Sequence, residues 1–203
     1  MITKSKLAIE LSRLESFENP KVRAEQYMTD AENAAEALWL AKMRGDTDGR
    51  AIADLGCGTG ILGIGAILLG ASKVYFVDND ENALNICSNN LRKLGMEKKA
   101  EIALAHVGNF DKKVDVVFQN PPFGTKIRHA DREFLEKAFE IAGVVYSFHK
   151  LETREFIERF AQQRGFVITN LLKFGMPLKV TQKFHKSRIR RINVGCWRFE
   201  KAL

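Results

Sequence analysis

Arg50-Ala-Ile-Ala-Asp-Leu-Gly-Cys-Gly-Thr-Gly60 combines a short apolar run with a cluster of glycines. The apolar run predicts a buried strand, and the sequence from Ile61 to Leu69 predicts a helix directly after the glycines. Glycines between a strand and a helix let the backbone turn sharply and approach a ligand at the helix N-terminus. The stretch therefore predicts a nucleotide-like binding site inside an α/β fold.

The rest of the chain continues this alternation of strands and helices. Strands are predicted at 73–78, 101–105, 114–119 and 144–148, and helices at 81–94, 131–142 and 152–164. Two final strands, at 166–174 and 188–199, have no helix between them and must run antiparallel to each other. Two helices, at 4–14 and 30–43, precede the sheet, and Thr29 or Asp30 caps the second.

This order of elements predicts a Rossmann-like α/β fold, a seven-stranded, mostly parallel sheet with helices on both faces and an antiparallel last strand. A length of 203 residues fits a single domain. We expect residues 1–48 to form an N-terminal helical extension and residues 49–203 the Rossmann-like core.

The number and spacing of the cysteines, together with the hydropathy of the chain, indicate the cellular compartment of the protein. The three cysteines are widely spaced, with no CxxC pair, so neither a disulfide framework nor a metal site is predicted. The N-terminus lacks the apolar stretch of a signal peptide, and the longest weakly polar run, 61–71, is too short to span a membrane. We expect a cytoplasmic protein with no membrane partner.

Two carboxylates limit the class of ligand that the glycine loop can bind. Gly58 to Gly63 also fits the dinucleotide pattern GxGxxG, and Asp78 lies twenty residues after Gly58, so a dehydrogenase stays open on these residues alone. Asp54, at the end of the first strand, would repel a pyrophosphate but suits a ligand with a cationic end. S-adenosylmethionine is such a ligand, and we expect Asp78 to accept hydrogen bonds from its ribose hydroxyls.

Val116-Val-Phe-Gln-Asn-Pro-Pro-Phe-Gly124 indicates the reaction. Ligands of parallel sheets bind outside the carboxyl ends of the strands, so residues 120–123 face the cofactor loop. A conjugated amino group is a poor nucleophile and needs two acceptors for its hydrogens, which the Asn120 side chain and the Pro121 carbonyl can supply. Pro122 stiffens the turn, and Phe123 offers a face for stacking. We expect these four residues to form the catalytic site.

These motifs resemble those of class I S-adenosylmethionine-dependent amino-methyltransferases. The resemblance to one group of these enzymes becomes more specific with four further segments, at 25–29, 120–126, 145–150 and 183–186. Together they resemble the archaeal and eukaryotic methyltransferase-like group that methylates N6 of one adenosine in small-subunit ribosomal RNA. The resemblance implies that activity here, and it also implies a small zinc-binding activator protein as a partner.

The resemblance completes the predicted cofactor site. Many relatives place an acid after the third strand to hold the adenine amino group, whereas this chain has His106 and Val107 there. The predicted cofactor-binding residues are Gln26, Thr29, Asp54, Gly56, Gly58, Thr59, Gly60, Ile61, Asp78, Asn79, His106 and Val107.

The basic charge is concentrated near the C-terminus. The chain carries a net charge of +7, and residues 173–199 hold eight basic residues and no acid, so the remainder has a net charge of −1. A basic segment beside a stacking pocket suits phosphate contacts that position an unpaired base. The predicted RNA-binding residues are Lys126, Arg128, His149, Lys150, Lys183, His185, Lys186 and Arg188.

Other functions remain open at the level of the sequence. An enzyme that methylates a glutamine amide of a translation release factor also uses an Asn-Pro-Pro motif, usually followed by Tyr and preceded by a longer helical domain. Guanine-amino and DNA-adenine methyltransferases present the same chemistry. A non-catalytic RNA-binding module would explain the charge but would leave residues 120–123 unexplained.

Overall fold

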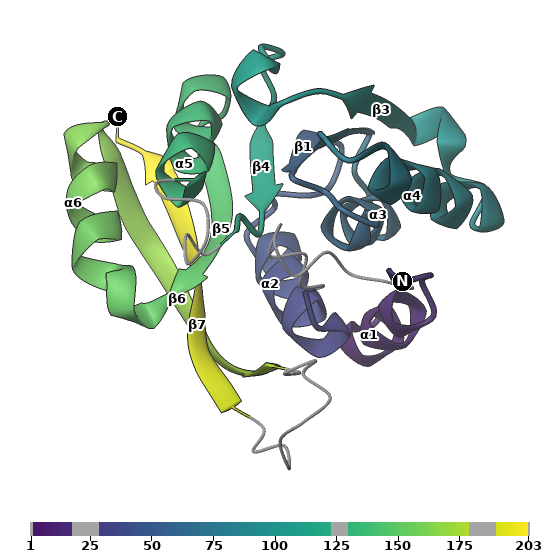
Figure 1. The fold of residues 1–203 in the computed structure, drawn as a ribbon, viewed down its shortest axis with the longest axis horizontal. Coiled ribbons are helices and arrows are strands. Elements are labelled where there is room, and N and C mark those ends of the chain that lie inside the picture. The colour runs from purple at the N-terminus through teal and green to yellow at the C-terminus, as the bar shows by residue number, and fades with distance from the viewer. Residues whose placement is uncertain (1, 18–28, 123–129, 179–189, 203) are drawn as a thin grey trace, which may run out of the picture.

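The fold was analysed in a computed structural model, which describes residues 2–17, 29–122, 130–178 and 190–202. A seven-stranded sheet forms its centre, in the order β3-β2-β1-β4-β5-β7-β6 (Figure 1). The strands are β1 (Ala51–Leu55), β2 (Lys73–Asp78), β3 (Ala100–Leu104), β4 (Val116–Gln119), β5 (Val144–Lys150), β6 (Phe166–Leu178) and β7 (Arg190–Lys201).

Strand directions confirm the predicted fold class. β1 to β5 pair in parallel, and β7 runs antiparallel to both β5 and β6. The parallel strands therefore end at one edge of the sheet, called here the carboxyl edge. β5, predicted to end at Phe148, continues to Lys150, and β6, predicted to end at Phe174, continues to Leu178.

The helices are α1 (Lys4–Ser12), α2 (Ala31–Met43), α3 (Ile61–Leu68), α4 (Glu81–Lys93), α5 (Ala130–Ile141) and α6 (Arg154–Gln163), with 3₁₀ turns at Glu97–Lys99, η3 (Val107–Asn109) and Leu151–Thr153. Short polar side chains cap α1, α2 and α4, at Thr3, Asp30 and Asp80. Asp30 caps α2 by accepting from the amides of Glu32 and Asn33, which decides between the two predicted caps. None of the described helices is long and apolar enough to cross a membrane.

Apolar side chains cover both faces of the sheet. Residues alternate along each strand, so Ile52 joins the cluster beneath α1 to α4, while Ala53 joins the cluster beneath α5 and α6. Gly63 of α3 lies so close to Phe76 of β2 that an added Cβ would stand 2.3 Å from the ring. A glycine at this position of the GxGxxG pattern thus permits close packing of helix on strand.

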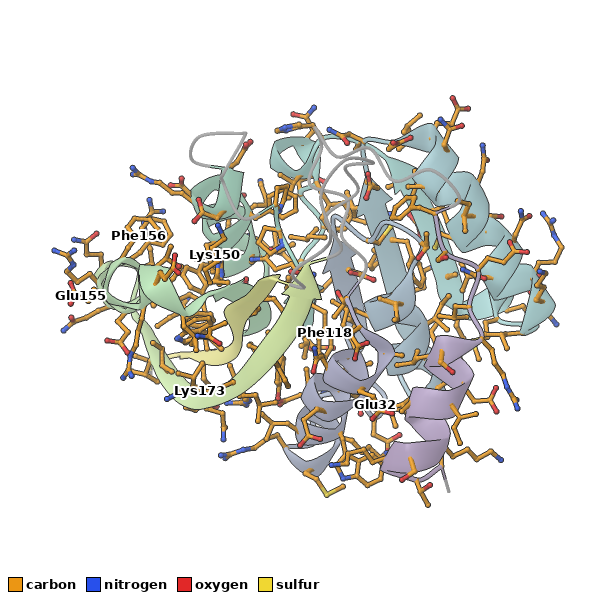
Figure 2. The ribbon with its side chains drawn as sticks, turned by 60° about the horizontal axis from the view of Figure 1, so that its bottom comes forward. Glu32, Phe118, Lys150, Glu155, Phe156 and Lys173 are labelled. Carbon is orange, nitrogen blue, oxygen red and sulfur yellow. The ribbon has the colours of Figure 1, made fainter. Side chains whose placement is uncertain are left out.

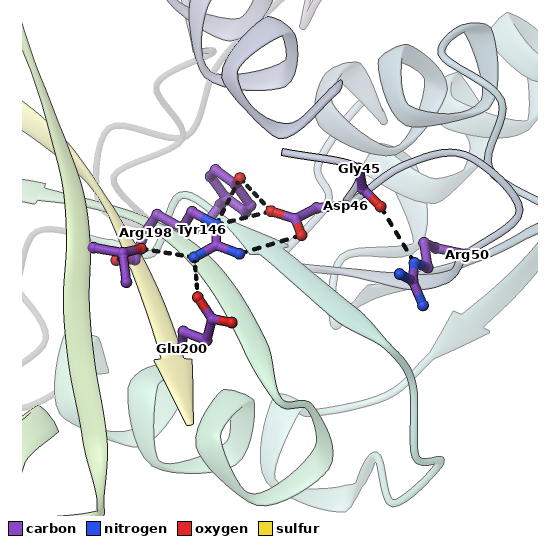
Figure 3. A network of polar contacts seen from close by, with 7 residues as sticks. Gly45, Asp46, Arg50, Tyr146, Arg198 and Glu200 are labelled. Carbon is purple, nitrogen blue, oxygen red and sulfur yellow. Dashed lines mark hydrogen bonds and ion pairs between the residues drawn. The ribbon is translucent and has the colours of Figure 1, made fainter. Parts of the chain in front are cut away.

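A buried ion pair joins the end of α2 to the sheet (Figure 3). Arg198 of β7 donates from Nε to Asp46 Oδ2 at 2.8 Å and from Nη2 to Oδ1 at 3.2 Å, and Tyr146 of β5 donates to the same carboxylate at 2.6 Å. Arg198 also donates to Glu200 and Thr169, at 2.6 and 2.7 Å. Asp46, in the loop between α2 and β1, therefore fixes this end of α2 to β5 and β7.

Candidate active site

The glycine loop between β1 and α3 is held against the end of β2. The amides of Gly56 and Cys57 donate to the Val77 carbonyl at 2.8 and 3.0 Å, and the Gly58 amide donates to Asp78 Oδ2 at 2.8 Å. Gly58 has φ of +54° and Gly60 of +91°, a left-handed conformation that favours glycine. The structure thus brings the predicted loop residues and Asp78 together at the carboxyl edge.

Asp78 keeps acceptor capacity after fixing the loop. Its Oδ1 accepts from the Asp80 amide at 2.9 Å, and its Oδ2 accepts from Gly58. A carboxylate offers about four acceptor positions, so Asp78 can still accept from a ribose hydroxyl. Burial raises the pKa of Asp78, although amide hydrogen bonds from Asp80, Gly58 and Asn79 oppose the shift.

Asp54 is almost fully buried beneath the glycine loop. Its Oδ2 accepts from the Gly63 amide at 2.7 Å, so it satisfies one of the free amides in the first turn of α3. Burial raises the pKa of Asp54 to about 7, against a lowering by the Gly63 amide and with a further rise from Asp78. The structure therefore shows Asp54 holding the loop.

Asp54 should make stability depend on pH. Because its folded-state pKa is raised from 3.8 to about 7, its stabilising contribution is present below the unfolded value and is lost as the pH rises through about 7. Asp54→Asn keeps an acceptor for Gly63 but cannot ionise. Relative to wild type, its melting temperature should therefore increase between about pH 5 and about pH 8.

Thermal unfolding of both proteins without cofactor, at the two pH values, checks this expectation. Asp111→Asn, at an exposed position, is the matched control and should differ from wild type equally at both values. A difference between Asp54→Asn and wild type that does not change with pH would contradict the raised pKa.

The turn after β4 carries a fixed amide. Asn120 Nδ2 donates to Thr29 Oγ1 at 2.9 Å, while Asn120 Oδ1 is buried without a hydrogen-bond partner among the described residues. Thr29 is 3% exposed and directly precedes the Asp30 cap of α2. The contact leaves the side-chain oxygen of Asn120 as a free acceptor. A buried acceptor without a partner is costly, which suggests that a ligand completes it.

A buried polar row lies beside this turn. Gln119 Nε2 donates to Ser147 Oγ at 2.9 Å, and Ser147 Oγ lies 2.6 Å from His149 Nε2. Gln119 and Ser147 were not predicted as site residues, since a polar residue inside an apolar strand gives no indication of its partner. Their pairing joins the last residue of β4, which directly precedes Asn120, to the middle of β5.

The prediction that His149 contacts RNA does not fit this arrangement. His149 is 1% exposed, and burial lowers its pKa to about 3, so the imidazole is neutral and is not available to a phosphate. The cause is the extra length of β5, because His149 inside the strand faces the core as Ser147 does. Lys150, one residue later, is partly exposed on the side of the molecule that carries α6 (Figure 2).

The turn after β3 holds the remaining predicted cofactor residues. Val107 is buried, and the side chain of His106 is half exposed. The Ala105 amide donates to the Asp78 carbonyl at 2.9 Å, which ties this turn to the end of β2, where Asn79 follows. The predicted residues Gln26, Phe123, Lys126, Arg128, Lys183, His185, Lys186 and Arg188 lie outside the described residues.

The polar groups at the carboxyl edge fit S-adenosylmethionine. Asp78 presents acceptors for a ribose diol, the loop of residues 56–60 admits close backbone approach, and Asn120 Oδ1 is an unsatisfied acceptor at the adjacent strand end. Within the described ranges, no group of three or more His, Cys, Asp or Glu side chains could hold a metal ion.

Comparisons with known proteins identify methyltransferases similar to this chain. The family described as ribosomal protein L11 methyltransferase (PrmA) matches residues 35–121. The rRNA N(6)-adenosine-methyltransferase Mettl5 of Drosophila melanogaster is 34% identical over 96% of this chain and 95% of its own length. The METTL5 protein of Danio rerio, of the same description, is 34% identical over 93% and 94%.

A solved structure shows the same fold throughout. That of a proposed RNA methyltransferase from Pyrococcus horikoshii superposes with a TM-score of 0.91 at 45% identity and covers 100% of both chains. The sheet, the glycine loop and the Asn-Pro-Pro turn are those of class I methyltransferases, whose methyl donor is S-adenosylmethionine. Full-length identity of this degree means that the chain belongs to the family of rRNA N6-adenosine methyltransferases.

Proposed function

We propose that this chain transfers a methyl group from S-adenosylmethionine to N6 of an adenosine in ribosomal RNA, within the small subunit. The observation that carries the proposal is the amide of Asn120, whose nitrogen is held by Thr29 and whose buried oxygen is unpartnered. It stands at the carboxyl edge beside a glycine loop and a carboxylate suited to the methyl donor. Relatives described as rRNA N6-adenosine methyltransferases match nearly the whole chain.

The turn activates the amino group by alignment and charge stabilisation. Asn120 Oδ1 and the Pro121 carbonyl accept its two hydrogens, so that the nitrogen lone pair leaves conjugation with the ring and points at the methyl carbon. S-adenosylmethionine supplies an electrophilic methyl group on a sulfonium. The new N–C bond forms as the C–S bond breaks, and the bonding pair goes to sulfur. The two acceptors stabilise the positive charge that develops on nitrogen, which then loses a proton.

The remaining site residues take supporting roles in this proposal. Asp78 accepts from the ribose, Asp54 holds the start of α3, and Val107 packs against the base. The loop residues Gly56, Gly58, Thr59, Gly60 and Ile61, together with Gln26, Thr29 and Asn79, complete the cofactor site, while Pro122 and Phe123 shape the pocket of the target base. The whole chain acts as one methyltransferase domain.

Basic residues position the RNA. Lys150 at the end of β5 and Lys173 on β6 lie on the side of the molecule where α6 and β6 are found (Figure 2), and Lys173 is exposed. Electrostatic contacts of this kind set the register on a nucleic acid without reading its sequence. Lys126, Arg128, Lys183, His185, Lys186 and Arg188, which lie outside the described residues, are proposed to contact RNA as well. We place the action of the protein in the cytoplasm, where ribosomal subunits are present.

The edge strand β3 supports the proposal of a zinc-binding activator protein. β3 pairs only with β2, and it exposes Ile102 and Leu104 by 40% and 59%. An unpaired edge with apolar side chains is a template for another chain. Purified from its native cells, the protein should carry zinc, which the double variant Ile102→Lys/Leu104→Lys should lack. Ile9→Lys, at an exposed position of α1, is the control, and equal zinc in all three proteins would exclude this edge.

One assay tests the proposed reaction. The protein is incubated with labelled S-adenosylmethionine and separate fractions of rRNA, tRNA and protein, and the products are digested to nucleosides and amino acids. We expect label in N6-methyladenosine from rRNA. Label in a protein glutamine, in a methylated guanosine or in no fraction would overturn the proposal, and Asp78→Ala serves as the variant with impaired cofactor binding.

A further inference from the structure

We propose that Glu133, on α5, accepts a hydrogen bond from the exocyclic amino group of the cofactor adenine. The proposal rests on S-adenosylmethionine being the cofactor, and it concerns a residue 27 positions away from the turn at which the base would lie. The turn after β3 itself contains no carboxylate, because its residues are His106, Val107, Gly108 and Asn109.

The order of strands fixes the direction of the cofactor. Along the carboxyl edge, β4, β1, β2 and β3 follow one another. The target amino group is met at Asn120 after β4, the glycine loop follows β1, and the ribose is met at Asp78 after β2. The base must then extend to the turn after β3, which the hydrogen bond from the Ala105 amide holds against Asp78.

Helix α5 places a carboxylate over that turn. Glu133 Oε1 lies 3.5 Å from His106 Nδ1, and an added Cβ on Gly108 would stand only 3.0 Å from the same oxygen. The missing side chain at Gly108 thus leaves room for the carboxylate. Both the Glu133 and the His106 side chains are about half exposed, at 49% and 53%, so a ligand can reach them.

The residue next to Glu133 shows that α5 borders the cofactor loop. The Phe134 ring lies against Gly56, where an added Cβ would stand 2.8 Å from its Cε1. The first turns of α5 therefore reach from the loop after β1 to the turn after β3. Glu133 and Phe134 form one wall of the site whose other elements are the strand ends.

The chemistry favours Glu133 over His106 as the acceptor. A carboxylate accepts hydrogen bonds and donates none, and an adenine amino group donates two. His106 Nδ1 already accepts from the Gly108 amide at 3.4 Å, so this nitrogen is occupied. A hydrogen bond to an ionised group is stronger than one between neutral groups. Glu133 thereby takes the place of an acid that the turn lacks.

Two ligands that differ at this amino group and at the neighbouring ring nitrogen N1 test the proposal. S-adenosylhomocysteine carries the amino group and an unprotonated N1, whereas S-inosylhomocysteine has a carbonyl oxygen and an N1–H. By calorimetry, wild type should bind the adenosyl compound more than about 10-fold more tightly, because a carboxylate repels the inosyl oxygen. Glu133→Gln should bind the adenosyl compound about 10-fold more weakly and should lose most of the preference, because its amide can also donate.

Two further variants make the outcome decisive. Glu136→Gln, on the same helix, with similar exposure and paired to Arg164, should keep the wild-type preference. Asp78→Asn should lower the affinity for both ligands without changing the ratio of the two affinities. An unchanged ratio in Glu133→Gln, with Asp78→Asn weakened, would overturn the role of Glu133 and leave the cofactor site standing. Failure of wild type to bind either ligand would overturn both.

Discussion

Asn120→Ala is expected to lower kcat by about 10²- to 10³-fold, the loss typical of removing one preorganised electrostatic contact to a transition state. Asn120 Oδ1 is buried and unpartnered among the described residues, so it is free to stabilise the charge that develops on the attacking nitrogen. Because the amide meets the target base, affinity for the cofactor should change little. Single-turnover methylation of rRNA, together with calorimetry of S-adenosylhomocysteine binding, separates the two effects.

Two variants distinguish the acceptor from its support. Asn120→Asp retains acceptor oxygens at the same place and should lie between wild type and Asn120→Ala in kcat. Thr29→Val removes the group that accepts from Asn120 Nδ2 at 2.9 Å and frees the amide to rotate, so it should lower kcat by a smaller factor. An Asn120→Ala protein that keeps more than half of the wild-type activity would remove Asn120 from the mechanism.

Asp46→Ala is expected to destabilise the fold by about 3 kcal/mol, because breaking a buried pair leaves an uncompensated charge. Arg198 would lose two hydrogen bonds, and Tyr146 would lose its acceptor. Although burial alone would lower the pKa of Arg198, its hydrogen bonds to Asp46 and Glu200 raise it, so the guanidinium stays charged and needs its partner. The free energy of unfolding, measured in urea, reports the loss.

Replacing Asp46, Tyr146 and Arg198 together tests the physical basis of the network. The triple variant Asp46→Leu/Tyr146→Phe/Arg198→Met removes these three buried polar groups, leaves Thr169 and Glu200 in place, and should recover most of the lost stability, since apolar replacements of buried pairs are often neutral. Glu36→Ala, which breaks the exposed contact with Lys4, should cost less than about 1 kcal/mol. A loss below about 1 kcal/mol for Asp46→Ala would show that water can replace the carboxylate.

The fold could be predicted largely because its signals are local. Glycines at 56, 58 and 60 after an apolar run predicted the turn from β1 to α3, and the missing helix between the last two strands predicted their antiparallel pairing. The predicted ends of the helices and strands were less accurate. β5 runs two residues past its predicted end, because pairing with β7 continues to Lys150 opposite Val194.

Contacts between distant parts of the chain could not be predicted. Thr29 and Asn120 are 91 residues apart, and Gln119 and Ser147 are 28 apart, so no spacing rule connects them. His149 was predicted at the surface because β5 was expected to end before it. The structure buries every residue of β5 from Val145 to His149, so His149 is covered whichever face of the sheet it takes, and that cover comes from elements distant in the sequence.

Helix α2 is attached at one end to the candidate active site and at the other end to the middle of β5 and to β7. Thr29, just before its first turn, orients Asn120, and Asp46, just after its last, is anchored by Arg198 and Tyr146. Thirteen helical residues separate the two attachments by about 20 Å. Because α2 is held at both ends, a displacement of one end is transmitted along the helix axis to the other end. If Asn120 meets the target amino group as proposed, the ion pair at the far end of α2 also contributes to how accurately that group is aimed.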